Sequence, residues 1–135
     1  MGRINGKFGL IDWVPIRLST RRIPYEELVA WFTQADICWI TPLRDGLNLV
    51  AKEYVAAKQG NTGGLVLSEF TGASVLLNGA ILTNPYSQNK MDESFNQAIS
   101  IPLEEQLKRM EMMTSAVESY TVKDWAEEQI KSVDD

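Results

Sequence analysis

The feature that most restricts the fold of this chain is a short, almost wholly apolar run at Asp36–Thr41, which lies between two helical patterns. A strand without polar alternation is typical of a parallel sheet that is covered by helices on both faces. The helical pattern before the run begins at Pro24, a residue type favoured at the first position of a helix. After the run, Pro42 ends the strand, and Asn48 can cap a second helix that reaches about Lys58. This order of elements predicts an α/β fold.

Other short segments continue the alternation of strands and helices. Val14–Ser19 alternates apolar and polar residues and is expected to form an early strand. Two further strands are expected at Leu65–Ser68 and Ala80–Thr83, with a helical turn between them around Thr71–Leu77.

The end of the chain carries helical patterns only. One helix is expected at Met91–Ser100, and a longer one starts at Pro102, breaks near Tyr120 and resumes through Trp125. The sequence thus predicts one domain over residues 1–135, with about four parallel strands, flanking helices and a long C-terminal helical segment. Since four strands is few for such a sheet, either the sheet is small or one edge is left to a missing segment or a partner.

Composition excludes several classes of function. The chain has 135 residues, 18 acidic against 13 basic, and a net charge of −5, which argues against binding to nucleic acid or to anionic membranes. It has no histidine, so histidine-based metal sites and catalysis are excluded, and we expect no metal and no cofactor. The single cysteine, Cys38, cannot form an intrachain disulfide. No run approaches the ~20 apolar residues of a membrane span, and no signal-peptide pattern is seen, so a cytoplasmic protein is expected.

The connection from Thr41 to Glu53 is the first place to look for a binding site, because ligands of open parallel sheets bind beyond the carboxyl ends of the strands. It leads from a strand end into a helix N-terminus, where the free amides of Leu49 and Val50 could bind a phosphate or pyrophosphate. A plain strand–turn–helix connection would show the same pattern.

Two carboxylates lie in this connection. Glu53 shares a helical stripe with apolar residues, and an inward-facing carboxylate there could accept hydrogen bonds from ribose hydroxyls. Asp45, beside Gly46, could hold sugar hydroxyls or a developing positive charge. Each has a simpler alternative: Asp45 can be an ordinary Asp-Gly turn residue. Glu53 can form a salt bridge with one of three cations, Lys52, Lys58 or Arg44.

The long segment Thr41–Ala57 closely resembles a signature of the trehalose-6-phosphate synthase family, which are retaining glycosyltransferases of the GT-B fold. Shorter segments agree in order and spacing with the same family: Gly2–Lys7, Asp12–Ile16, Leu65–Ala73, Asn84–Tyr86 and Trp125. Ile16–Thr20, Ile23–Leu28 and Ile37–Ile40 look more like the glucosylglycerol-phosphate synthase branch. The resemblance implies a Rossmann-like domain. The segments of this chain match only the C-terminal half of the family's donor-binding domain.

The resemblance also implies roles for individual residues. Asp45 and Glu53 match the family's acid-x7-acid motif, in which the first acid is catalytic and holds the donor sugar and the second holds the ribose. The amides that would assist Asp45 are those of Gly46, Leu47 and Asn48, and those that would bind the diphosphate belong to Leu49 and Val50. The nucleobase pocket would be lined by Ile23 and Leu28. Leu47 departs from the Met that is common in the signature. The change matters little, because the backbone of this residue, and not its side chain, would bind the donor.

The resemblance implies ADP-glucose or UDP-glucose as the donor, and glycerol 3-phosphate or glucose 6-phosphate as the acceptor of the complete enzyme. The family's acceptor domain and its basic diphosphate clamp precede the matched region, so we expect no transfer by this chain alone. A different class of function, a non-catalytic module that forms a homo-oligomer, is the alternative. A third possibility is an enzyme that recruits the missing complementary domain from another polypeptide.

Overall fold

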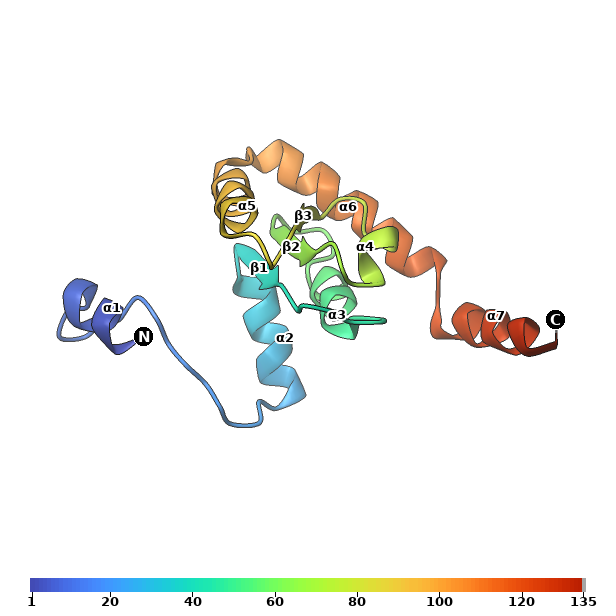
Figure 1. Ribbon diagram of the computed structural model, residues 1–135, viewed down its shortest axis with the longest axis horizontal. Helices are drawn as coiled ribbons and strands as arrows, with labels where there is room; N and C mark the ends of the chain where they lie inside the picture. The colour runs from blue at the N-terminus through green and yellow to red at the C-terminus, as the bar shows by residue number, and fades with distance from the viewer. Residues whose placement is uncertain (135) are drawn as a thin grey trace.

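The centre of the molecule is a parallel sheet of three strands, in the order β1, β2, β3 (Figure 1). The computed structural model describes residues 1–134, with side chains up to Ser132. The strands are β1 (Ile37–Ile40), β2 (Gly64–Ser68) and β3 (Ile81–Thr83), and both neighbouring pairs are parallel. The predicted α/β class with a parallel sheet is therefore confirmed.

Seven helices accompany the sheet in the described residues. They are α1 (Gly2–Phe8), α2 (Tyr25–Gln34), α3 (Leu49–Ala57), α4 (Ala73–Leu76), α5 (Gln88–Ser100), α6 (Leu103–Ser119) and α7 (Val122–Asp134). The predicted break near Tyr120 is confirmed, since it separates α6 from α7. The helix α5 begins three residues before the predicted Met91, because the Ser87 side chain caps it by accepting from the amide of Lys90.

The helices cover the two faces of the sheet unequally. Leu65 and Leu67 of the central strand β2 point into a core that contains residues of α3, α4 and α6, with Phe32 of α2 packed against it. Val66, between them, points to the other face, where it packs with Ile81 and with Ala98 of α5. All five residues of β2 are buried, as expected for a strand covered on both faces.

The prediction of a strand at Val14–Ser19 is wrong. The sheet has three strands instead of about four. The segment has no regular secondary structure and pairs with no strand in the part of the chain that the structure describes. Its backbone is held at one point, where Asn5 of α1 exchanges two hydrogen bonds with Ile16, of 2.7 and 3.0 Å. Alternation of side chains favours an extended backbone, but a strand also needs a neighbouring backbone to pair with.

The two ends of the chain lie outside the central body. Figure 1 shows α1 and α7 projecting on opposite sides of the sheet and its helices. No helix in the described residues is long and apolar enough to cross a membrane.

The contact between α6 and the turn before β3 gives a stability test. A Cβ on Gly79 would lie 2.4 Å from the carbonyl oxygen of Arg109 and 2.8 Å from Cγ of Met113. We therefore expect Gly79→Ala to push α6 from the sheet and to lower the free energy of unfolding by about 1–3 kcal/mol. Urea denaturation followed by circular dichroism measures this. The control is Gly6→Ala, where an added Cβ meets nothing within 4 Å, and an equal loss in both variants would contradict the prediction.

Candidate functional site

The loop between β1 and α3 lies at the carboxyl end of the sheet and is tied to the neighbouring loop after β2. The amide of Asp45 donates to the carbonyl oxygen of Phe70 (3.2 Å), and the amide of Gly72 donates to the carbonyl oxygen of Asp45 (3.0 Å). The two loops approach so closely that a Cβ on Gly72 would lie 1.9 Å from the carbonyl oxygen of Gly46. Only glycine fits there without displacing the loop. Ligands of open α/β sheets bind at this end, beyond the carboxyl ends of the strands.

The carboxylate of Asp45 is held by the residues that follow it. One of its oxygens accepts from the amides of Leu47 (3.2 Å) and Asn48 (3.0 Å), and the other accepts from the Asn48 side-chain amide (2.9 Å). The backbone hydrogen bond from Asn48 and then its side-chain hydrogen bond hold the pKa of Asp45 below its ordinary value of 3.8. The carboxylate is therefore ionised at neutral pH and fixed in direction.

Asn48 joins this turn to the helix that follows. Its backbone has φ 49°, in the left-handed region that asparagine tolerates better than most residues. Its side-chain oxygen accepts from the amide of Ala51 (3.0 Å), which confirms the predicted helix cap. The same side chain thus contacts both the acid and the first turn of α3.

The first two amides of α3 have no hydrogen bond in the described part of the chain. They belong to Leu49 and Val50, whose side chains are exposed. Because the positive end of the helix dipole lies at the same place, this turn can bind an anion.

Glu53 is exposed, so the prediction that it faces inward is wrong. The inward face of α3 is formed by Ala51, Tyr54 and Val55, and the rotation of the helix leaves Glu53 beside them at the surface. The alternative salt bridges to Lys52, Lys58 or Arg44 are not seen among the described residues either: the amine of Lys58, for example, donates to the carbonyl oxygen of Thr33.

The remaining candidates lie around α2. Glu53 lines a hollow of about 440 Å³ that also contacts Tyr25. Ile23 and Leu28 line a second hollow, of about 510 Å³, and Tyr25 is common to both. Tyr25 was not identified as a site residue from the sequence, because its position in a helical stripe looks like ordinary packing. The structure thus places Asp45–Val50 in the loop and the first turn of α3, and it places Ile23, Leu28 and Glu53 on two hollows that share Tyr25.

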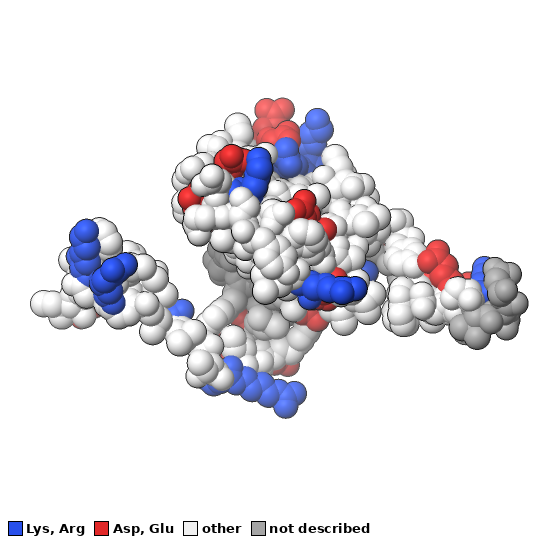
Figure 2. All heavy atoms as spheres, viewed as in Figure 1, with Lys and Arg blue, Asp and Glu red and all other residues white. Residues whose placement is uncertain are grey.

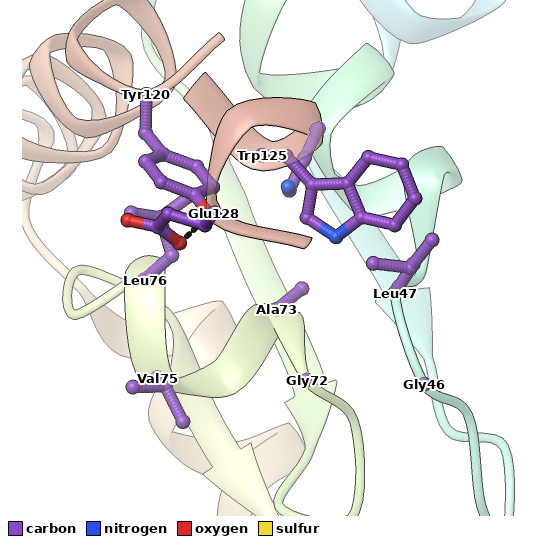
Figure 3. Close-up of a pocket in the computed structure, with 10 residues that line it drawn as sticks. Gly46, Leu47, Gly72, Ala73, Val75, Leu76, Tyr120, Trp125 and Glu128 are labelled. Carbon is purple, nitrogen blue, oxygen red and sulfur yellow. Dashed lines mark hydrogen bonds between the residues drawn. The ribbon is translucent and has the colours of Figure 1, made fainter. Parts of the chain in front are cut away.

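A third hollow, of about 290 Å³, lies directly against the loop (Figure 3). Gly46 and Leu47 form one wall, Gly72 and Ala73 another, and Trp125 of α7 closes it together with Tyr120 and Glu128. The sequence singled out Trp125 only as a match to a family position. The described residues contain no group of three or more acidic, cysteine or histidine side chains placed to hold a metal ion.

The parallel sheet, with an acid loop at the carboxyl end of its strands, matches part of the GT-B glycosyltransferase fold. The fold superposes on a crystal structure of an α,α-trehalose-phosphate synthase (UDP-forming) from Burkholderia xenovorans in complex with glucose-6-phosphate, with a TM-score of 0.89 and 39% identity, over 99% of this chain and 30% of that one. A trehalose-6-phosphate enzyme of Escherichia coli bound with UDP-2-fluoro glucose gives a TM-score of 0.87 and 38% identity, over 97% of this chain and 29% of that one.

The chain belongs to glycosyltransferase family 20, whose sequence profile matches residues 1–135. It is 56% identical to a glucosylglycerol-phosphate synthase of Synechocystis over 93% of this chain and 25% of that protein. It is 40% identical to the 56 kDa subunit of an α,α-trehalose-phosphate synthase (UDP-forming) of Kluyveromyces lactis over 94% of this chain and 26% of that protein. The resemblance found in the sequence is confirmed, and the chain spans about a quarter of the length of these relatives.

The hydrogen bonds of Asp45 predict a pKa change in a single variant. Asn48→Gly keeps the left-handed backbone and the amide but removes the side-chain donor, so we expect the pKa of Asp45 to rise part of the way to 3.8. Because the folded pKa is lowered, this carboxylate stabilises the fold above its ordinary pKa, and the stabilisation is lost as the pH falls through the folded pKa. Titration of the carboxyl carbon by NMR measures the shift. Asn61→Gly, in an exposed turn, is the control, and an unchanged Asp45 pKa in Asn48→Gly would refute the assignment.

Proposed function

We propose that this chain is the part of a donor-binding domain that holds a nucleotide-sugar in a retaining glycosyltransferase. The observation that carries the proposal is the Asp45 carboxylate, ionised and oriented at the strand end, directly before the free amides of Leu49 and Val50. A carboxylate suits sugar hydroxyls and a developing positive charge, and a helix N-terminus suits a diphosphate. In this arrangement a sugar and its diphosphate would lie side by side.

The hydrogen bonds refine the roles that the family resemblance implies. The amides of Leu47 and Asn48 already donate to Asp45, so we propose that they act by orienting this carboxylate and not by binding the sugar directly. Gly46, without a side chain, leaves room for the sugar beside Asp45. The ribose would lie at Glu53, whose exposure makes it accessible to a ligand, and the base would extend toward Ile23 and Leu28.

The reaction we propose for the complete enzyme is synthesis of a glucosyl phosphate compound from ADP-glucose or UDP-glucose. The higher identity to a glucosylglycerol-phosphate synthase (56%) than to a trehalose-phosphate synthase (40%) favours glycerol 3-phosphate as the acceptor. Asp45 would contribute by stabilising positive charge at the sugar carbon during transfer. We propose a cytoplasmic role in making an osmolyte, with residues 1–135 as one partial domain. Transfer would require an acceptor site and a basic diphosphate clamp from additional protein, as the family resemblance implies.

Calorimetry with ADP, UDP, ADP-glucose and UDP-glucose tests the binding proposal on the 135-residue chain. We expect at least one glucose conjugate to bind, with no transfer to either acceptor. Glu53→Gln should weaken binding about tenfold or more, because a hydrogen bond to a charged group contributes about 1.5–3 kcal/mol. The control is Glu111→Gln, an exposed glutamate on α6. A folded sample that shows no heat at millimolar ligand would refute the proposal.

A second candidate function, an oligomeric interaction module, is favoured by exposed apolar side chains. Ile11 is fully exposed, its neighbours Leu10 and Trp13 are more than half exposed, and no strand in the described residues pairs with the outer edge of β1. Residues 1–22 also carry five Lys or Arg and one acid, Asp12, although the chain has a net charge of −5. On the face shown in Figure 2, the charged side chains of α1 are all basic. This basic, apolar segment could bind the acidic body of another copy.

Light scattering tests this candidate. We expect a dimer or larger assembly at low micromolar concentration that dissociates when Ile11 and Trp13 are both replaced by Ser, because the exposed apolar area would be lost. A monodisperse monomer of the unchanged chain would contradict it.

A further inference from the structure

The last described helix, α7, projects from the central body (Figure 1), but its residue Trp125 lies beside the candidate donor loop (Figure 3). Two hollows flank the contact, one of about 290 Å³ and one of about 540 Å³. Four residues line both of them: Leu47, Lys52, Tyr120 and Trp125. These residues therefore form the ridge between the hollows, and Figure 3 shows the indole of Trp125 beside Leu47. Helix α7 thus reaches the donor loop through one large aromatic side chain.

The start of α7 is fixed by its own hydrogen bonds. The amide and hydroxyl of Thr121 donate to the Asp124 carboxylate at 2.7 and 2.6 Å, and the Asp124 amide donates back to the Thr121 hydroxyl at 3.4 Å. The Tyr120 hydroxyl donates to the carboxylate of Glu128, eight residues further on. The amine of Lys52 lies 5.9 Å from the centroid of the Tyr120 ring, which connects this junction to α3. The direction in which α7 leaves α6 is therefore determined locally.

Leu47 is the point where this helix can act on the loop. Its amide donates to Asp45, so a displacement of Leu47 changes a hydrogen bond of the carboxylate. Its side chain belongs to neither core cluster of the described residues and is partly exposed. Trp125 is 38% exposed and lines the same two hollows as Leu47. The indole of Trp125 is an apolar surface beside Leu47 (Figure 3) that can limit the motion of this side chain.

We propose that Trp125 is a positioning residue, which braces Leu47 so that the loop holds the Asp45 carboxylate ready for the donor sugar. An ordered loop binds its ligand more tightly because the entropy of ordering has already been lost before binding. The effect on affinity rests on the proposed function, whereas the effect on the order of the loop does not. Phe can replace much of the indole contact, and Ala cannot.

The experiment compares three variants of the full chain: Trp125→Ala, Trp125→Phe and, as a control, Trp31→Ala. Trp31 is a similarly exposed indole on α2 that lines a different hollow. Three quantities are measured: the 15N heteronuclear NOE of the Leu47 and Asn48 amides, the pKa of Asp45, and the dissociation constant for ADP-glucose and UDP-glucose. Circular dichroism checks that each variant is folded.

Trp125→Ala should lower the NOE at Leu47 and Asn48, raise the pKa of Asp45 toward 3.8, and raise the dissociation constant about tenfold. Trp125→Phe should restore most of each value, and Trp31→Ala should leave all three unchanged. If Trp125→Ala does not fold, Trp125→Leu compared with Trp125→Phe gives the same test.

Two results would overturn the inference. One is a folded Trp125→Ala with unchanged loop NOE and Asp45 pKa; the other is weaker donor binding with an unchanged loop, which would make Trp125 a direct contact. If the unchanged chain binds neither sugar nucleotide, the proposed function fails, and the loop measurements alone decide on Trp125.

Discussion

The central strand β2 is buried on both faces, and this burial sets where the helices lie. Leu65 and Leu67 require one layer of helices and Val66 requires another, so α3, α4 and α6 lie on one side and α5 on the other. Because the strands are parallel, each connection must run back along one face of the sheet before the next strand starts, so all three strands finish at the same end of the sheet. The loops after β1 and β2 therefore end side by side.

That proximity creates the candidate site. The loop of Asp45 contacts the loop of Gly72 through two backbone hydrogen bonds and a close approach that excludes any side chain at Gly72. With the backbone held in this way, the Asp45 carboxylate is oriented by the amides that follow it, and α3 begins with amides free to bind an anion. One short loop thus combines a negative group for sugar hydroxyls with a positive dipole for a diphosphate.

Local interactions were predictable from the sequence, and interactions between distant segments were not. The Asn48 cap, the strand after Asp36 and the break near Tyr120 depend on residues within one or two turns of each other, and the structure confirms all three. The Val14–Ser19 strand was predicted wrongly because strand formation depends on a partner that local alternation does not specify. The inward orientation predicted for Glu53 is wrong because a stripe of apolar residues does not show how far the helix is rotated against the core.

The α/β class, the family and the chemistry available at the Asp45 loop follow from the sequence alone, because they depend on residue type, spacing and local hydrogen bonding. The tertiary structure decided which loops meet and which side chains remain accessible. The closeness of Gly72 to Gly46, the exposure of Glu53 and the placement of Trp125 beside Leu47 all join elements far apart in the chain. Their positions follow from how helices pack on the shared sheet, a property that no single segment contains.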